Sequence, residues 1–167
     1  TESRAWLGLV RVIELLPPAL DAQLQRDSGF THFEFMVLSM LQFAPDSTLR
    51  MTALAQGTNA ALGRLSHVCS RLERRGLVER FPCAADKRAT NVRLTGAGRR
   101  DLLDAAPGHF GIARALVIDT LTREQLACLA DITEALGRRL DPDSRIPPIS
   151  EPLPAPPEPW VRRGQER

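Results

Sequence analysis

The stretch from residue 61 to residue 95 constrains the fold most strongly, because a two-faced helix runs directly into two short strands. One face of the helix predicted over Ala61–Arg75 is apolar at the helical period, and it carries Ala61, Leu65, Val68, Cys69 and Leu72. The opposite face carries Gly63, Arg64, His67, Ser70, Arg71 and Arg74. Gly76 is expected to end the helix, since glycine readily adopts the left-handed conformation found there. The chain must therefore bury one side of this helix and leave an arginine-rich side exposed.

Two short strands are predicted after this helix, over residues 77–82 and 90–94. The second strand alternates apolar and polar side chains, as expected when one face is buried. The hairpin tip between the strands is predicted at Ala84-Ala85-Asp86-Lys87-Arg88. A two-faced helix followed by a hairpin is typical of a winged helix-turn-helix.

A short helix and a tight turn precede the two-faced helix. The short helix is predicted over Met51–Gln56 and the turn over residues 57–59, a spacing that fixes how the two helices cross. The position just before the two-faced helix is Ala60-Ala61, which offers no capping hydroxyl. Either Asn59 caps the helix, which then starts early, or the helix is uncapped until DNA phosphates approach its amides. We favour the Asn59 cap because asparagine is among the best N-capping residues.

Two further helices are predicted to begin at capping boxes, in which a hydroxyl and a carboxyl or amide side chain satisfy free amides. Thr31 with Glu34 starts the first, whose apolar stripe is Phe33, Met36, Val37, Met40 and Leu41. Thr122 with Gln125 starts the last helix of the chain, whose stripe is Leu126, Leu129, Ile132, Thr133, Leu136 and Leu140.

The two remaining helices are long. The first is predicted to span about 25 residues and to end at Ser28-Gly29. Pro17-Pro18 removes two amide donors midway, so this helix is expected to kink or break there. The other is predicted from Gly96 to Leu121, with Thr95 as its cap and a bend at Pro107-Gly108.

Length and composition are those of an ordinary globular protein. The 167 residues suffice for one core, or for two small cores that share a long helix. No apolar run approaches the roughly 20 residues that span a bilayer, so we expect a cytoplasmic protein with no membrane partner. Three cysteines without CxxC spacing and three scattered histidines predict no disulfide framework, metal site or cofactor. Residues 141–167 hold eight of the thirteen prolines and predict an extended or disordered tail.

Positive charge is concentrated in residues 64–100, which hold ten Lys and Arg against three acidic residues. This segment carries +7 whereas the whole chain carries only +2, so the remainder carries −5. Arginine outnumbers lysine 21 to 1, which favours forked guanidinium contacts to phosphates or guanines. A globular protein that gathers its positive charge on one helix and one loop usually binds a polyanion, here duplex DNA.

Two motifs make the chain resemble the MarR family of bacterial transcription regulators. Met51–Gln56 (MTALAQ) followed by Leu72–Arg80 (LERRGLVER) is similar to the family's second helix-turn-helix half and its LExxGLVxR ending. Residues 86–98 (DKRATNVRLTGAG) are similar to its DxR…VxLTxxG wing signature. The resemblance covers residues 4–140.

The resemblance implies a mainly helical fold with a small β-hairpin wing, assembled as an obligate homodimer. Residues 1–30 and 96–140 would form the helical dimerisation region and residues 31–95 the winged helix-turn-helix domain, with residues 141–167 as a Pro-rich tail. It also implies a repressor that a small, often aromatic or phenolic, effector releases from its operator. For a dimer of this type the operator is an inverted repeat of roughly 16–20 base pairs.

The recognition helix and the wing supply the expected DNA contacts. Arg64 is placed to grip a guanine bidentately, and His67 to contact a base edge or a phosphate. Arg88 is expected in the minor groove, where narrow segments concentrate negative potential, and Lys87 on a phosphate. Asp86 is expected to hold Arg88 or the hairpin backbone, since phosphates repel a carboxylate. The expected DNA-binding residues are Asn59, Arg64, Ser66, His67, Ser70, Arg71, Arg74, Lys87, Arg88 and Arg93.

Six residues are candidates for an effector pocket beneath the first helix: Trp6, His32, Phe33, Met36, His109 and Phe110. Core packing is the alternative role for the apolar members of this set, and 5% aromatic residues with no tyrosine argue against a large aromatic cage. Among the cysteines, Cys69 is expected in the core, and Cys83 and Cys128 are candidates for exposed thiols. The family's peroxide sensors carry a cysteine near the start of the first helix, which this chain lacks, so redox sensing is not expected.

Other functional classes fit the sequence less well. No GxSxG, HExxH, P-loop or GxGxxG motif occurs, so no catalytic residue is predicted and the protein is not expected to be an enzyme. A winged helix used for protein–protein contact predicts an acidic or apolar recognition face, whereas this one carries arginines. A DNA-binding repressor that needs no effector stays open as an alternative.

Overall fold

The structure is a computed structural model that describes residues 1–84 and 86–142, and only the backbone of Lys87. The predicted tail therefore lies outside the described residues from position 143 onward, as does Ala85 of the hairpin tip. Helices dominate the described part and strands form one small sheet, which confirms the predicted fold class. The main elements are α1 (Glu2–Ser28), α2 (His32–Phe43), β1 (Thr48–Arg50), α3 (Met51–Gly57), α4 (Leu62–Arg74), β2 (Val78–Cys83), β3 (Asp86–Leu94), α5 (Gly96–Leu116) and α6 (Arg123–Leu140).

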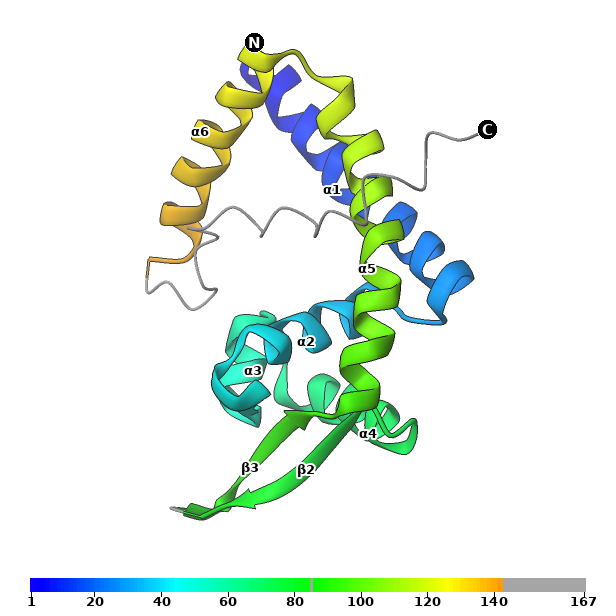
Figure 1. Cartoon of the computed structure of the whole chain (residues 1–167). Coiled ribbons are helices and arrows are strands. Elements are labelled where there is room, and N and C mark those ends of the chain that lie inside the picture. Colours follow the sequence, from blue (N-terminus) through cyan, green and yellow to red (C-terminus); the bar gives the residue numbers. More distant parts are fainter. Residues whose placement is uncertain (85, 143–167) are drawn as a thin grey trace, which may run out of the picture.

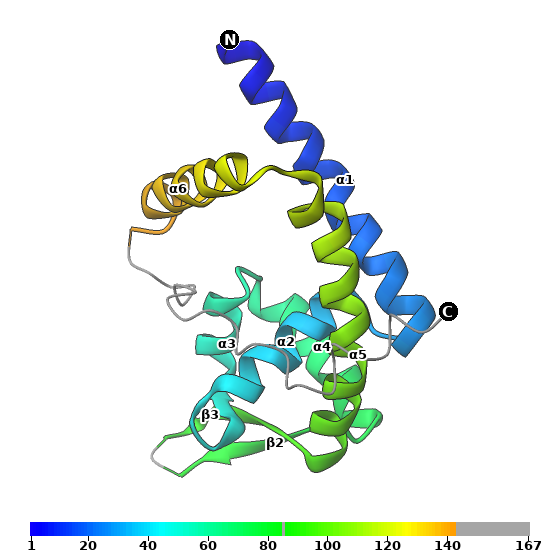
Figure 2. The same cartoon turned by 45° about the horizontal axis from the view of Figure 1, so that its top comes forward.

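The elements are arranged as a lower lobe and an upper helical part (Figure 1). The lower lobe holds α2, α3, α4 and the strands, and the β2–β3 hairpin projects from it. Helix α5 rises from this lobe beside α1, and α6 leaves the end of α5 on a separate course (Figures 1 and 2). The recognition helix and the hairpin therefore lie at the opposite end of the molecule from α6.

A kink or a break was predicted at Pro17-Pro18, and the break is wrong, because α1 passes through both prolines as one element (Figure 2). The two prolines remove two amide donors from a 27-residue helix, and the remaining backbone hydrogen bonds keep the helix continuous. The buried residues Leu20 and Leu24 follow the prolines, so packing holds the second half of the helix in place. The predicted end is confirmed, because Gly29 adopts a left-handed φ of 68° and caps α1.

Helix α2 starts at the predicted capping box. The Thr31 hydroxyl accepts the Glu34 amide at 3.0 Å, and the Glu34 carboxylate accepts the Thr31 amide at 2.8 Å. Its predicted apolar stripe is only partly correct, since Val37 and Leu41 are buried whereas Phe33, Met36 and Met40 are half-buried. The difference arises because α2 contacts α1, α3, α5 and β3, which turns its most buried arc toward Phe35 and Leu38.

The sheet has three antiparallel strands in the order β1-β3-β2, and β1 was not predicted. The three residues of β1, which directly precede α3, pair with residues 91–93 of β3. The hairpin is also longer than predicted, because Cys83 already pairs with Asp86, which leaves only residues 84–85 between the strands. Asp86 and Arg88 therefore belong to β3 and not to a loop.

Helix α5 is shorter than predicted. It ends at Leu116, and a separate 3-10 turn, Ile118–Thr120, precedes α6. Its cap is confirmed, since the Thr95 hydroxyl accepts the Gly98 amide at 3.0 Å, and it runs on through Pro107 without interruption. The capping box of α6 is confirmed as well.

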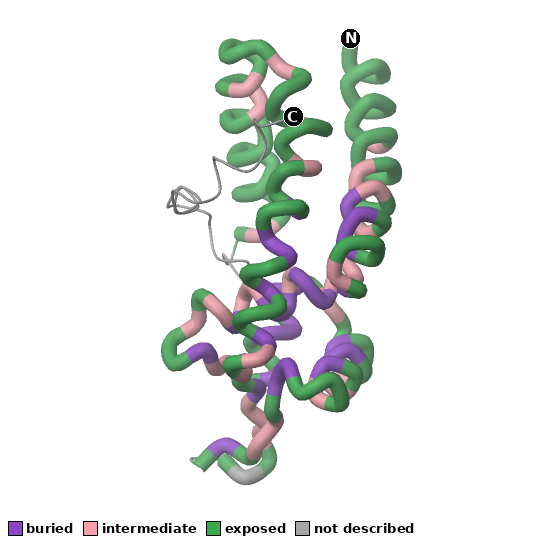
Figure 3. The backbone as a smooth tube through the Cα atoms, turned by 45° about the vertical axis from the view of Figure 1, so that its right-hand side comes forward, coloured by how far each residue is buried: buried purple, intermediate pink, exposed green. Residues whose placement is uncertain are grey.

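The core fills the lower lobe and the lower part of α1 and α5, where Figure 3 shows most of the buried backbone. Helix α6 contains no buried residue, and the first half of α1 is exposed as well. The largest fully buried side chains of the core include Phe30, Leu24, Leu38, Leu41, Leu54, Leu65 and Leu72.

Within the described residues, no helix combines the length and the apolar character that crossing a membrane requires.

Candidate nucleic-acid interface

Helix α4 divides into a packed face and an open face. Leu65, Val68, Cys69 and Leu72 are all at most 8% exposed and pack into the core, as predicted. Ala61 is the exception, because it is exposed and stands at the N-cap before the helix begins. Gly63, His67 and Arg74 are exposed on the opposite side, with the half-buried Ser70 between them. The open face is therefore polar and basic over three turns of helix.

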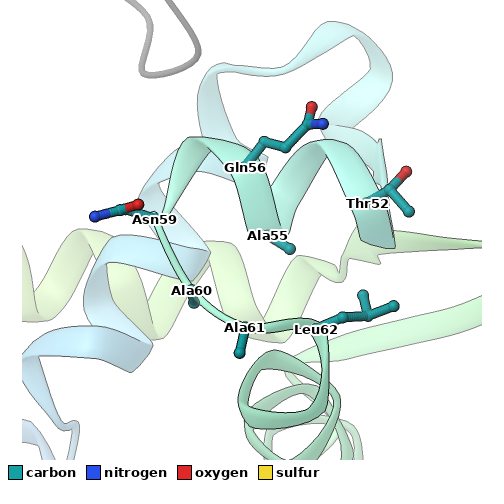
Figure 4. Close-up of a pocket in the computed structure, with 7 residues that line it drawn as sticks. All are labelled: Thr52, Ala55, Gln56, Asn59, Ala60, Ala61 and Leu62. Atoms are coloured by element: carbon teal, nitrogen blue, oxygen red, sulfur yellow. The ribbon is translucent and has the colours of Figure 1, made fainter. Parts of the chain in front are cut away.

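The N-terminus of α4 has no side-chain cap, so the favoured Asn59 cap is wrong. Asn59 takes a left-handed φ of 49° in the turn and is exposed, and the helix starts only at Leu62. The backbone here lines a depression between α3 and α4, to which Thr52, Gln56 and Asn59 contribute polar side chains (Figure 4). First-turn amides without a capping group form a favourable place for an anion, since the helix dipole is positive there.

The C-terminus of α4 is tied to the wing. Gly76, at φ 72°, donates its amide to Glu73 and Leu77 donates to Leu72, which closes the helix as predicted. The Glu73 carboxylate accepts the Arg80 amide at 3.0 Å and the Arg80 guanidinium at 2.7 Å. This hydrogen bonding from the Arg80 side chain is the main cause that lowers the pKa of the Glu73 carboxyl. Glu73 and Arg80 thus set the hairpin against the helix that it follows.

A row of arginines lies along the flank of α4 that faces α2. The Arg64 guanidinium carbon is 4.5 Å from the centroid of the Phe33 ring. Arg71 donates to the buried Glu34 carboxylate at 2.7 Å, and Arg75 lies 3.8 Å from the same carboxylate. Arg71, which was predicted to bind DNA, therefore already has an intramolecular partner that the sequence did not reveal.

The predicted serines lie on the other side of the same helix. Ser66 is half-buried, and Ser70 donates its hydroxyl hydrogen to the Ser66 carbonyl at 2.9 Å. A hydroxyl has one hydrogen to donate, so Ser70 would have to rotate to reach a phosphate. His67 is exposed at the centre of the open face.

The wing presents Arg88 from β3. The Arg88 amide donates to the Asp86 carboxylate at 3.0 Å, which confirms that Asp86 holds the hairpin backbone. The Arg88 side chain is exposed, and among the described residues it forms no ion pair. Arg93 is engaged, since it pairs with Glu79 and lies 5.0 Å above the Phe81 ring. The side chain of Lys87 lies outside the described residues.

The six candidate pocket residues separate into two groups. His32, His109 and Phe110 come together at the junction of α1, α2 and α5, and His109 lies 5.4 Å from His32 and 5.9 Å from Phe110 between ring centroids. Trp6 is 64% exposed near the free end of α1, and Phe33 lies under Arg64 instead. Met36 is half-buried.

Sequence reasoning missed two members of this junction, Phe35 and Gln23. The Phe35 ring lies 4.3 Å from His109, closer than any predicted partner. Gln23 is 4% exposed and lies against α5, since its Nε2 would be 2.9 Å from a Cβ on Gly108, the residue before His109. Phe35 comes one position before Met36 of the predicted stripe, so the prediction missed it because the buried arc of α2 is shifted. A buried glutamine in a long helix has no local signal in sequence. We call His32, Phe35, His109, Phe110 and Gln23 the junction cluster.

The junction cluster holds its histidines neutral. Burial lowers the pKa of His109 to about 4, and the neighbouring His32 acts in the same direction. Burial also lowers the pKa of His32, an effect that Asp21 opposes. Three buried atoms here, His32 Nδ1, His109 Nδ1 and Gln23 Oε1, have no hydrogen-bond partner in the part of the chain described.

We expect the protein to lose stability as the pH falls from about 6.5 to about 4. In this range the unfolded chain protonates His109 while the folded chain keeps it neutral, so protons favour unfolding. A pKa of about 4 against 6.5 corresponds to about 3 kcal/mol. Urea unfolding at a series of pH values measures the slope, and H109F, which keeps an aromatic ring, is expected to remove most of it. An H109F variant with the wild-type slope would contradict the assignment.

The cysteines occupy three different environments. Cys69 is fully buried and burial raises the pKa of its thiol to about 11, which fits the predicted core role. Cys83 is buried as well, contrary to prediction, although it lies at the tip end of β2, and Arg50 donates to its sulfur at 3.4 Å. Cys128 is exposed on α6. Nowhere in the described ranges do three His, Cys, Asp or Glu side chains gather as metal ligands.

These features define a winged helix-turn-helix protein. Helix α4 has one packed face, one basic face and an uncapped N-terminus, and the β2–β3 hairpin follows it directly. Two MarR family transcriptional regulators from Streptomyces coelicolor have similar structures. Sco3205, solved in complex with DNA, is 39% identical, with 83% of this chain and 87% of that chain covered and a TM-score of 0.79. AbsC is 32% identical, with 83% and 93% covered and a TM-score of 0.77.

A curated relative agrees with these structures. The HTH-type transcriptional repressor YetL of Bacillus subtilis (strain 168) is 30% identical over 112 residues, which are 65% of this chain and 67% of YetL. No family model matches the chain. The chain belongs to the MarR family of transcriptional regulators. This confirms the resemblance seen in the motifs and the prediction that the protein is a regulator and not an enzyme.

Proposed function

We propose that this protein binds duplex DNA as a homodimer and represses transcription from an inverted-repeat operator. The observation that carries the proposal is the open face of α4, where Gly63, His67 and Arg74 are exposed opposite a packed apolar face. Such a helix fits the major groove, which is about 12 Å wide. The similarity to Sco3205, which was solved in complex with DNA, and to the repressor YetL supports the same function.

The proposed DNA contacts follow from where the predicted residues lie. His67 and Arg74, on the open face of α4, are assigned to base edges, as is Arg64, which is exposed on the flank beside α2. A phosphate is assigned to the uncapped α4 N-terminus beside Asn59. Arg88 of the wing is assigned to the minor groove. Ser66, Ser70, Lys87 and Arg93 remain candidate phosphate contacts, and Arg71 is treated separately below.

The homodimer is supported by apolar side chains that the single chain leaves exposed on α1, α5 and α6. A soluble monomer rarely exposes a large contiguous apolar patch, whereas an intertwined dimer would bury it. Residues 1–30 and 96–140 remain the proposed dimerisation region and residues 31–95 the proposed DNA-binding domain. The exposed side chains include Trp6, Leu7, Leu9, Val12, Ile13, Leu15, Leu116, Ile132, Leu136 and Leu140.

The junction cluster is the proposed effector site. Its buried polar atoms without partners require an explanation, and a small aromatic molecule with hydrogen-bonding groups would supply their partners. The cluster joins α1 and α5, which belong to the proposed dimerisation region, to α2 of the DNA-binding lobe. In the dimer, the effector and the operator can each favour a different spacing of the two DNA-binding domains. Binding of the effector then weakens binding of the operator, and this is sufficient for release.

Selection of bound duplexes from a random pool tests the proposal. We expect an inverted repeat of roughly 16–20 base pairs, with release of the duplex by some member of a panel of aromatic acids. With six or more phosphate contacts, the affinity is expected to fall by roughly 10³-fold between 50 and 200 mM salt. Selected sites without two-fold symmetry, or an affinity insensitive to salt, would exclude the dimeric repressor.

A further inference from the structure

The first turn of α2 contacts every arginine on the adjacent flank of the recognition helix. Arg64, Arg71 and Arg75 are spaced by seven and four residues, so they form one row along α4. Phe33 lies under Arg64, and Glu34 contacts the other two. Two neighbouring residues of α2 therefore act on the row in chemically different ways.

Phe33 holds Arg64 without occupying its donors. The guanidinium carbon lies 4.5 Å from the ring centroid, which is a cation–π contact. A phenylalanine ring carries no oxygen or nitrogen acceptor, so the guanidinium N–H groups, which can grip guanine O6 and N7, keep their hydrogen-bonding capacity. Arg64 is exposed and forms no ion pair with any described residue. The contact restricts the side chain while leaving its N–H donors free for a base.

Glu34 acts in the opposite way on Arg71. Its carboxylate is 1% exposed, and it accepts the Thr31 amide at 2.8 Å and the Thr31 hydroxyl at 3.1 Å besides Arg71 Nε at 2.7 Å. Removing the arginine would leave a buried charge without its main partner, which is strongly unfavourable. Arg71 is thus held against α2 although its side chain is 48% exposed.

We propose that Phe33 and Glu34 are positioning residues that set the specificity of DNA readout. Phe33 holds Arg64 where it can contact a base, and Glu34 holds Arg71 away from the DNA. The proposal rests on the proposed binding of DNA through α4. An unrestrained Arg71 would add a phosphate contact on any sequence and so strengthen non-specific binding. A restrained Arg64 favours a particular base and strengthens operator binding alone.

Replacing Phe33 tests the first half. F33L keeps an apolar side chain but removes the ring, and we expect operator affinity to fall about fivefold, as for one cation–π contact, with little change on random duplex. F33Y restores the ring and is expected to restore the affinity. In an R64A background, F33L should have no further effect on operator binding. A loss that F33Y does not restore, or an equal loss in the R64A background, would overturn this half.

Replacing Glu34 tests the second half with the opposite sign. E34Q preserves the capping box, since glutamine serves at this position, but removes the charge that holds Arg71. We expect roughly fivefold tighter binding to random duplex and a log–log salt slope steeper by about 0.9 for each Arg71 that gains a phosphate. The double variant E34Q/R71Q leaves no buried charge and is expected to return the slope to the wild-type value. An unchanged slope in E34Q would overturn this half, as would a steeper slope that persists in E34Q/R71Q.

The controls separate this proposal from the proposed function. If the wild-type protein selects no duplex, the proposed DNA binding fails. If the wild type binds its operator and R64A weakens it, while F33L and E34Q leave both affinities and slopes unchanged, only the positioning roles fail. A thermal melt of each variant shows whether the fold is intact before binding is compared.

Discussion

Replacing Gly98 with alanine is expected to destabilise the protein by roughly 3 kcal/mol, as for overpacking against an unyielding neighbour. A Cβ at this position would lie 2.1 Å from the Leu77 carbonyl oxygen and 2.9 Å from its carbon, both of which belong to the main chain. The Leu94 side chain would lie 2.8 Å away. The Leu77 carbonyl is held in place, because it also accepts hydrogen bonds from the Thr95 amide and the Thr95 hydroxyl. Urea unfolding of the variant measures the loss.

Gly96 offers the matched control two residues earlier in the same helical turn. A Cβ there would meet only the end of the Arg100 side chain at 3.6 Å, an ordinary contact. G96A is therefore expected to match the wild type or to exceed it slightly, since alanine favours a helix more than glycine does. Equal urea midpoints for G98A and G96A would show that the helix does not dock as closely as described.

Replacing Arg88 with alanine is expected to weaken operator binding at least about tenfold, the effect of losing one arginine contact in the minor groove. The fold should be unaffected, because only the Arg88 amide takes part in the hairpin, through Asp86. A gel-shift titration measures the change in affinity, and sedimentation shows whether the assembly is the same as that of the wild type.

Arg26 supplies the control for net charge. It lies in the last turn of α1, outside the wing and α4, and R26A removes the same positive charge. A loss confined to R88A assigns the effect to the wing. If R88A binds the operator as tightly as the wild type, the wing does not contact DNA in the way proposed.

Local signals in the sequence were sufficient for most element boundaries. Both capping boxes, the Gly29 and Gly76 helix ends and the Thr95 cap lie where they were predicted, because each depends on side chains within a few residues of one another. The same holds for the packed face of α4, since a strongly two-faced helix shows its period directly.

The errors arose where distant segments decide. Strand β1 has only three residues and exists because β3 lies beside it. Asn59 is one of the best N-capping residues, yet the tight turn between α3 and α4 takes it into a left-handed conformation. Cys83 was expected as a candidate for exposure and is buried at the tip end of β2, where Arg50 of β1 donates to its sulfur. None of these outcomes has a local pattern.

The sequence by itself determined the class of this protein, because the basic face of α4, its glycine stop and the wing motif are contiguous along the chain. The tertiary structure decided which of the basic side chains are available. Arg71 and Arg64 look alike in the sequence, but Arg71 contacts a buried carboxylate and Arg64 an aromatic ring. Both partners come from α2, 37 and 31 residues earlier in the chain. Charge and helical period are properties of neighbouring residues, whereas the partner of an arginine is fixed only when two helices pack together.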